Sequence, residues 1–421
     1  MIPVFISYCK NISWKPCKGI FIEIFLPNVS QCITKERSFH GMKVSLLQDN
    51  DYICEKSRNE KYRNMKNPFK FGTVVDGAFF TDREKELQSI GQLLESENHL
   101  VLISPRRFGK NSLVCKALQY IDRPVIMVNL QSVTTVAELA ALLLKRVFKI
   151  YPFEKIKHAM THFRFIPTFS VNPMTDGVDV AFQPGSNNNV VLEDVLMLIE
   201  KLGEKNKFVV VLDEFQEIVD LEKGLDKYLR SVMQLQHNVN YIFLGSQESM
   251  MTEIFEKKKS PFYHFGVLMR LPKIPYDDFF RYLSKRFAPM VLEQPKQIAE
   301  EILSFSQCHP YYTQQLAFQV WNMLEQKNDV EKLVDHAVDE LTRLHDFDYE
   351  RIWMAMNKTD RRILTVLAQN VASPLDSKRG IPTSTAFSAL KRLSQQGYVI
   401  KNEKYEIDDP FFARWIYNRS L

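Results

Sequence analysis

The sequence predicts an α/β fold in which a parallel β-sheet is covered by helices and is followed by a second, mainly helical part. Three patterns support this prediction. Short apolar runs of strand length alternate with helical segments between about residue 100 and residue 245. The pattern turns all-helical from residue 275, and from residue 351 it reads as three helices, a hairpin and a last helix. The 421 residues, of which 45% are hydrophobic, suffice for two or three domains.

Composition favours a cytoplasmic protein without a membrane partner. The sequence contains no run of about 18 apolar residues, which a membrane span needs. Lys10, Lys15 and Lys18 interrupt the apolar N-terminal stretch, so a signal peptide is not expected. The net charge of +5 is small for this length and argues against a strongly basic coat for nucleic acid. Six cysteines without metal-ligand spacing are typical of a reducing compartment.

Residues 1–64 differ from the rest of the chain. They hold four of the six cysteines and show no clear helical or strand period. The stretch that begins at Met65 reads like a natural start. We interpret residues 1–64 as an N-terminal extension that is either poorly ordered or lies upstream of the true start; a small independent domain is the alternative.

The folded part opens with a helix. Thr81 and Glu84 have the S/T-x-x-E spacing of a capping box, in which each side chain bonds a backbone N–H at the helix start. This spacing predicts a helix that starts here and runs to about Glu95.

The first strand leads into a loop with a glycine–lysine pair. Residues 100–103 are apolar, and residues 104–111 align with the pattern G-x-x-x-x-G-K-[ST], with Gly109 and Lys110 in register. Backbone N–H groups at a helix N-terminus bind anions, and the lysine reaches the outer phosphates of a nucleotide. The pattern therefore predicts a nucleotide-binding loop made of Ser104, Pro105, Arg106, Arg107, Phe108, Gly109, Lys110, Asn111 and Ser112.

Two positions depart from this pattern. Ser104 replaces the first glycine, where the turn needs glycine less strictly than at Gly109. Asn111 replaces the Ser or Thr whose hydroxyl binds Mg²⁺, and its amide oxygen is a poorer ligand. The adjacent Ser112 points about 100° away around the helix. Asn111 thus stays a candidate metal ligand, and we expect hydrolysis to be slow.

After a second buried strand at residues 124–130, a further strand ends in two carboxylates. Residues 208–212 form an apolar run that is followed by Asp213 and Glu214. Ligands of open parallel sheets bind at the carboxyl ends of the strands. Asp213 is therefore the candidate ligand of Mg²⁺, and Glu214 is the candidate base that orients or deprotonates an attacking water. A pair of surface acids is the alternative.

Ser246 and Gln247 follow a further buried strand at residues 240–245. They would emerge beside Asp213, where they can hydrogen-bond the γ-phosphate or its water; an ordinary Gly-Ser turn is the alternative. Arg270 could face the phosphate of a neighbouring subunit, and His309 is a candidate ligand contact; for both, a structural role is the favoured alternative. Between the sheet strands, residues near 160–185 predict an inserted hairpin.

The C-terminal pattern is typical of a winged helix. Residues 383–393 suit a recognition-type helix, and residues 397–407 suit a two-stranded wing. The basic residues of this segment are few: Lys391, Arg392, Lys401 and Lys404. DNA binding through residues 383–404 therefore remains an alternative, while docking onto the sheet domain is favoured.

Six motifs together resemble the archaeal-type ATPase family, whose members are AAA+-related P-loop proteins of the STAND class. The motifs are FTDREKEL at 80–87, SPRRFGK at 104–110, VLDE at 211–214, FLGS at 243–246, HPYY at 309–312 and DPFF at 409–412. The resemblance extends from about Met65 to the C-terminus. It implies a P-loop NTPase core over 65–274, a helical lid over 275–345 and a winged-helix domain over 346–421.

The resemblance also implies roles for individual residues, with ATP and Mg²⁺ as cofactors. Gly109 and Lys110 would bind phosphates, Asp213 would support Mg²⁺, and Glu214 would activate water. Ser246 and Gln247 would match a polar sensor, so that Glu214, Lys110 and Gln247 are the catalytic candidates.

We therefore expect an ATP-binding P-loop ATPase that acts as a nucleotide-dependent switch with slow, Mg²⁺-dependent hydrolysis. Two alternatives stay open: a nucleotide-regulated DNA-binding protein, and a pseudo-ATPase scaffold that binds ATP without turnover. Each leaves room for a protein partner or a homo-oligomer.

Overall fold

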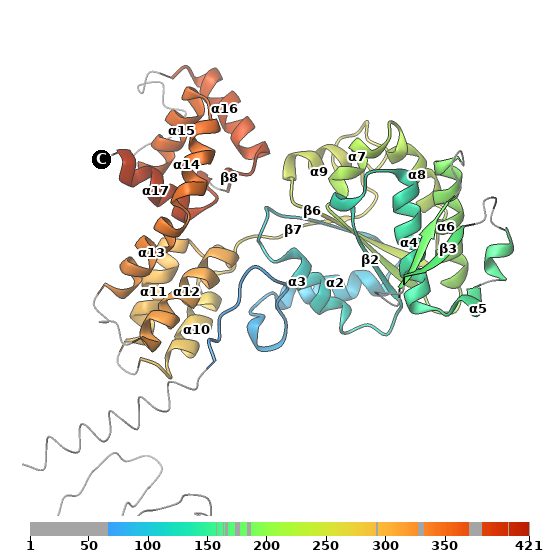
Figure 1. Ribbon diagram of the computed structural model, residues 1–421, viewed down its shortest axis with the longest axis horizontal. Helices are drawn as coiled ribbons and strands as arrows, with labels where there is room; N and C mark the ends of the chain where they lie inside the picture. Colours follow the sequence, from blue (N-terminus) through green and yellow to red (C-terminus); the bar gives the residue numbers. More distant parts are fainter. Residues whose placement is uncertain are drawn as a thin grey trace, which may run out of the picture. The chain divides into compact units, whose positions relative to one another are not determined.

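A five-stranded parallel sheet forms the centre of the first half of the described chain (Figure 1). Its strand order is β2–β5–β6–β1–β7, so the first strand lies inside the sheet between β6 and β7. The strands are β1 (Leu100–Ile103), β2 (Val125–Asn129), β5 (Phe208–Asp213), β6 (Val239–Gly245) and β7 (Val267–Arg270). The predicted parallel sheet is confirmed.

Side chains of the central strands alternate between the two faces of the sheet. In β1, Val101 and Ile103 belong to one buried cluster, whereas Leu100 and Leu102 belong to another. Both faces are covered, which explains why the strands read as continuous apolar runs in the sequence.

Helices cover each face. The cluster that contains Val101 also contains side chains of α4 (Val136–Ile150), α6 (Asn188–Leu202), α8 (Leu225–Met233) and α9 (Glu248–Phe255). The cluster that contains Leu100 includes side chains of α2 (Glu84–Glu95) and α3 (Lys110–Leu118). In Figure 1, α2 and α3 lie on the opposite side of the sheet from α8 and α9.

Helix α2 runs to Glu95 as predicted, but its N-terminus is capped differently from the expectation. The residue at the cap position is Arg83, whose backbone is left-handed with φ of 75°. Its guanidinium donates to Glu86 at 2.9 Å and to the carbonyl of Pro272 at 2.5 Å. The capping box expected from Thr81 is wrong, because an arginine with tertiary partners takes the cap position.

The predicted inserted hairpin corresponds to β3 (Thr168–Asn172) and β4 (Gly177–Ala181), which pair antiparallel. β4 lies against α4. The turn between the two strands lies outside the described residues.

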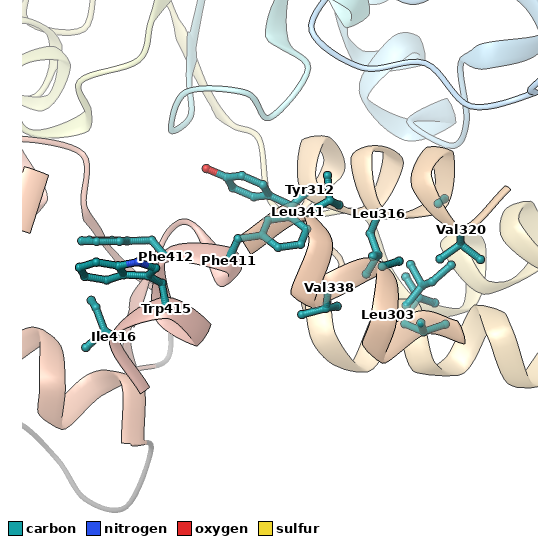
Figure 2. Close-up of a cluster of buried hydrophobic side chains, with 14 of the residues drawn as sticks. Leu303, Tyr312, Leu316, Val320, Val338, Leu341, Phe411, Phe412, Trp415 and Ile416 are labelled. Carbon is teal, nitrogen blue, oxygen red and sulfur yellow. The ribbon is translucent and has the colours of Figure 1, made fainter. Parts of the chain in front are cut away.

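The second half is built from helices and one small hairpin. The helices are α10 (Tyr276–Phe287), α11 (Pro295–Ser306), α12 (Pro310–Glu325), α13 (Leu333–Leu344), α14 (Asp346–Ala355), α15 (Lys358–Gln369), α16 (Thr383–Gln395) and α17 (Pro410–Ser420). The hairpin strands β8 (Val399–Lys401) and β9 (Tyr405–Ile407) pair antiparallel. One continuous buried cluster includes side chains of α10 to α17. Figure 2 shows part of this cluster, with Leu303 of α11 and Val320 of α12 towards one end and with Trp415 and Ile416 of α17 at the other.

The computed structural model describes residues 66–156, 158–162, 164, 167–172, 177–182, 187–291, 294–326, 332–369, 381–402 and 404–420. These all belong to one compact unit of the chain, Glu60–Leu421, and the extension expected over residues 1–64 lies outside them. Among the described residues, no helix combines the length and the apolar character that a bilayer crossing requires.

Candidate nucleotide-binding site

Three neighbouring strands bring the candidate residues to one edge of the sheet. β5, β6 and β1 are adjacent and parallel, so the residues that follow them meet at their carboxyl ends. These residues are Asp213 with Glu214, Ser246 with Gln247, and the loop that begins at Ser104. The backbone N–H of Ser104 donates to the carbonyl of Gly245 at 3.3 Å, which ties two of these ends together.

The phosphate loop, residues 104–109, connects β1 to α3. Gly109 is at the cap position of α3 with φ of 88°, a conformation that favours glycine. Ser104 and Phe108 are buried, whereas Arg106 and Arg107 are exposed. The loop therefore ends at the N-terminus of a helix, where backbone N–H groups attract anions.

Lys110 lies across the phosphate loop. Its Nζ donates to the carbonyls of Ser104 at 3.2 Å and Pro105 at 3.5 Å. Burial lowers the pKa of Lys110, and the nearby charges of Glu214 and Asp213 oppose that change. The ammonium is thus held at the loop by weak carbonyl partners that a phosphate group could replace.

Asn111 and Asp213 form a direct pair. Asn111 Nδ2 donates to Asp213 Oδ2 at 2.8 Å, and Asn129 Nδ2 lies 3.5 Å from the same oxygen. Burial raises the pKa of Asp213, and the hydrogen bond from Asn111 opposes this rise. Within the described ranges, no three His, Cys, Asp or Glu side chains gather to hold a metal ion. The residues fit Mg²⁺ of the nucleotide type, which needs one or two carboxylates and takes its other ligands from phosphates and water.

Ser112 is separated from this pair. Its hydroxyl accepts a hydrogen bond from the backbone N–H of Val75 at 3.0 Å, and the side chain is buried. The hydroxyl therefore binds the segment before α2 and not Asp213. This agrees with the position of Ser112 on α3, about 100° around the helix from Asn111.

Glu214 contacts Ser246, the residue that follows β6. Ser246 donates to Glu214 Oε2 from Oγ at 2.6 Å and from its backbone N–H at 3.3 Å. Gln216 Nε2 donates to the same oxygen at 2.6 Å. Burial alone would raise the pKa of Glu214, but these hydrogen bonds and the charge of Lys110 lower it below the usual value. The carboxylate is therefore held in its charged form.

A cleft of about 730 Å³ borders the phosphate loop and the residues that follow β6. Pro105, Arg106, Ser246 and Gln247 line it from the side of the sheet. Residues of α12, α14 and α16 and of the hairpin also line it. Gln247, the first residue before α9, thus lies at the edge of the cleft beside Ser246.

Sequence reasoning missed the contacts of Arg107. Its guanidinium lies 4.6 Å from the ring centre of Tyr311 and donates to the hydroxyl of Tyr312 at 3.0 Å. Both tyrosines belong to the first turn of α12, two hundred residues along the chain. Neither the SPRRFGK motif nor the HPYY motif indicates that these side chains meet.

His309 and Arg270 have structural partners. His309 caps α12 by accepting from the backbone N–H of Tyr311, and its ring lies edge-on to Phe108 with ring centres 4.8 Å apart. Arg270 pairs with Glu256 and lies 3.3 Å from the hydroxyl of Thr252. These contacts agree with the structural role that was the alternative for both residues.

The sheet order and the glycine–lysine loop define a P-loop NTPase fold of the AAA+ type. Residues 80–316 match the family described as an ATPase domain predominantly from Archaea. This match covers more than half of the chain, and the chain belongs to that family. The predicted ATPase is thereby confirmed at the level of the family.

Two solved structures have the same fold. The Walker-type ATPase PABY2304 of Pyrococcus abyssi matches with a TM-score of 0.59 and 18% identity over 84% of this chain and 99% of that chain. The ORC2 protein of Aeropyrum pernix, solved as ADPNP–ADP complexes, matches with a TM-score of 0.50 and 15% identity over 83% of this chain and 98% of that chain. A comparison with curated proteins found no match.

Proposed function

We propose that this ATPase is a nucleotide-dependent switch of the STAND class, with slow, Mg²⁺-dependent hydrolysis of ATP in the cytoplasm. One observation carries the switch: Arg107 of the phosphate loop donates to Tyr312 at the start of α12. A phosphate group at the loop would compete for this arginine, because Arg binds phosphate oxygens strongly. Nucleotide binding would then change the contact between the sheet and the helical half.

The contact continues into the C-terminal helix. The ring of Tyr312 packs edge-on against Phe411 of α17, with ring centres 6.0 Å apart (Figure 2). Asp409 caps α17 by accepting from the backbone of Phe411 at 2.9 Å, and Tyr349 of α14 donates to it at 3.0 Å. Hydrogen bonds from Tyr349 and Tyr312 oppose the rise in the pKa of Asp409 that burial causes. Arg107 is thus linked through Tyr312 to the start of α17.

We propose a chemical role for each residue at the sheet edge, and the contacts described above support these roles. Gly109 and Lys110 would bind the phosphates, with the other loop residues around them. Asp213, with the paired Asn111, would hold Mg²⁺, which supplies charge neutralisation for the transferred phosphoryl group. Glu214 would orient the attacking water as the base, and Ser246 and Gln247 would respond to the γ-phosphate. Hydrolysis would be slow because Asn111 offers no hydroxyl.

We also propose the division into an ATPase core over 65–274, a helical lid over 275–345 and a winged helix over 346–421. The hairpin of the proposed winged helix contacts the core. Ile400 belongs to the buried cluster of α2 and α3, and Glu406 pairs with Lys273 at 3.1 Å. These contacts favour docking onto the ATPase core.

DNA binding through residues 383–404 is less well supported. Arg392 donates to both oxygens of the buried Asp360, at 3.0 and 2.5 Å, so its charge is already neutralised. Lys401 lies 5.4 Å from the ring centre of Tyr405. Instead of DNA, the switch would then act on a protein partner or on a second copy of the chain.

The first experiment measures ATP binding and turnover with Mg²⁺ on the full chain. We expect Lys110→Ala to abolish binding, and Glu214→Gln to lower turnover roughly 10²–10⁴-fold while binding persists. ATP binding that survives Lys110→Ala would refute the assigned site. Binding without turnover in the unmodified chain would favour the pseudo-ATPase scaffold.

The second experiment tests the switch by amide hydrogen exchange at Phe411 and Phe412, whose N–H groups bond Asp409. A non-hydrolysable ATP analogue should increase exchange there, and Arg107→Met should give the increase without nucleotide. Arg106→Met is the matched control, since Arg106 is its exposed neighbour. Equal exchange with and without nucleotide would refute the switch.

A further inference from the structure

Gln216 is a fully buried glutamine that lies two residues after Glu214 in a short 3₁₀ helix, η4 (Phe215–Glu217). Its Nε2 donates to Glu214 Oε2 at 2.6 Å. We infer that Gln216 is a positioning residue for the carboxylate of Glu214, an inference that rests on the proposed role of Glu214 as the base. Neither the family match nor the resemblance assigns it a role.

The geometry shows what such positioning would achieve. The hydrogen bonds from Gln216 and from Ser246 Oγ and N–H all end on the same oxygen, Oε2 of Glu214. A carboxylate held at one oxygen from two sides cannot rotate freely, and it offers its other oxygen to a water in one direction. Activation of water depends on such a fixed direction. The backbone of Glu214 is left-handed, with φ of 54° and ψ of 48°, a conformation that is uncommon for residues other than glycine.

The amide of Gln216 is oriented by two carboxylates. Besides Glu214, its Nε2 lies 3.4 Å from Oε1 of Glu217, so the nitrogen end of the amide must face this pair. In the part of the chain that the structure describes, the other end of the amide, Oε1, is buried without a hydrogen-bond partner. An orphaned buried oxygen costs stability, and an apolar side chain of the same length would avoid that cost. The contact with Glu214 explains why an amide stands here.

A second buried glutamine provides the control. Gln314 of α12 donates from Nε2 to the neutral hydroxyl of Tyr282 at 2.9 Å, and its Oε1 also belongs to the buried atoms without a partner in the described residues. Gln314 has the same side chain and an equally unpaired oxygen, but its donor bonds Tyr282 and no carboxylate of the site. Its substitution reports what losing a buried amide does to the fold alone.

The experiment compares Gln216→Met and Gln314→Met in the full chain, with and without Glu214→Gln. Methionine keeps the length of the side chain and removes the donor. We expect Gln216→Met to lower kcat roughly 10- to 100-fold with little change in KM for ATP, a fraction of what loss of the base itself causes. In the Glu214→Gln background, Gln216→Met should have no further effect on the residual turnover, because it acts only through that carboxylate. Gln314→Met should leave kcat unchanged.

Gln216→Asn is the second variant, because its amide is one methylene shorter and draws the donor back from Glu214. It should lose kcat like Gln216→Met, and full turnover in either folded variant would overturn the inference. An equal loss of kcat when Gln216→Met is added to Glu214→Gln would overturn the inference too. Failure of both variants to fold would also overturn it, because Gln216 would then serve the fold of the loop. Full turnover of Glu214→Gln would instead refute the proposed role of Glu214.

Discussion

His99 makes the stability of the sheet depend on pH. It stands directly before β1, is buried, and accepts a hydrogen bond at Nδ1 from the backbone N–H of Tyr241 at 3.2 Å. Its ring packs against Phe265 with ring centres 4.5 Å apart. Burial, together with the nearby charge of Arg230, lowers the pKa of His99 from 6.5 to about 4. The folded protein therefore keeps this imidazole neutral.

The size of the effect on stability follows from the difference between the pKa values of His99 in the unfolded and folded chain. Between pH 6.5 and pH 4 the unfolded chain binds a proton at His99 that the folded chain does not, so the free energy of unfolding falls as the pH is lowered. This stability is complete above the unfolded pKa and is lost as the pH approaches the folded pKa. The full effect is ~3 kcal/mol, and about 2 kcal/mol of it should be lost between pH 7 and pH 5.

The assay compares urea unfolding of the unmodified chain and of His99→Asn, followed by far-UV circular dichroism from pH 8 to pH 5. Asparagine retains an acceptor for the N–H of Tyr241 but does not titrate. The difference between the two proteins cancels every other titrating group, so the unmodified chain should lose about 2 kcal/mol more than the variant. The same pH dependence in both proteins would refute the reasoning, as would an NMR titration that gives His99 a pKa near 6.5.

Three further predictions concern single substitutions. Asn111→Thr supplies the missing hydroxyl beside Asp213, and turnover of ATP with Mg²⁺ should rise roughly tenfold or more. Arg392→Ala leaves the buried Asp360 without its charged partner and should lower the free energy of unfolding by about 1–3 kcal/mol. Gly245→Ala adds a methyl group that overlaps the buried side chain of Met251, and should cost about 1–3 kcal/mol in thermal unfolding.

Each of these has an outcome that contradicts it. Unchanged turnover in Asn111→Thr would show that the residue after Lys110 does not limit hydrolysis. Unchanged stability in Arg392→Ala, with loss of salt-dependent DNA binding, would show that this arginine serves DNA instead of Asp360. A stable Gly245→Ala protein would mean that Met251 moves aside without loss.

Local patterns predicted most elements of the sheet half. The apolar runs before Ser104, Asp213 and Ser246 are β1, β5 and β6, because strands buried on both faces need continuous apolar sequence. Parallel strands end at the same edge of a sheet, so the predicted parallel sheet already implies that Ser104, Asp213 and Ser246 lie at one edge, whatever the strand order. The capping box at Thr81 failed because Arg83 has tertiary partners that a local rule ignores.

The contacts that the sequence did not predict are of two kinds. The bond between Arg107 and Tyr312 joins residues 205 positions apart, and nothing in either motif indicates its partner. Gln216, by contrast, left a signal: it is a polar residue two positions after Glu214, between the apolar Phe215 and Ile218, which are both buried. A polar side chain that follows a candidate base within one turn is worth examining for a contact with that base.

The position of Ile400 has a consequence for how the protein is made. This residue lies near the end of the chain, yet its side chain belongs to the same buried cluster as Leu100 and Leu102 of the first strand. During synthesis the sheet emerges from the ribosome early, while a residue that covers one of its faces emerges near the end. A nascent chain therefore exposes apolar surface until translation is nearly finished, and such surface is what chaperones protect. A premature stop codon before residue 400 would likewise damage the domain that was made first.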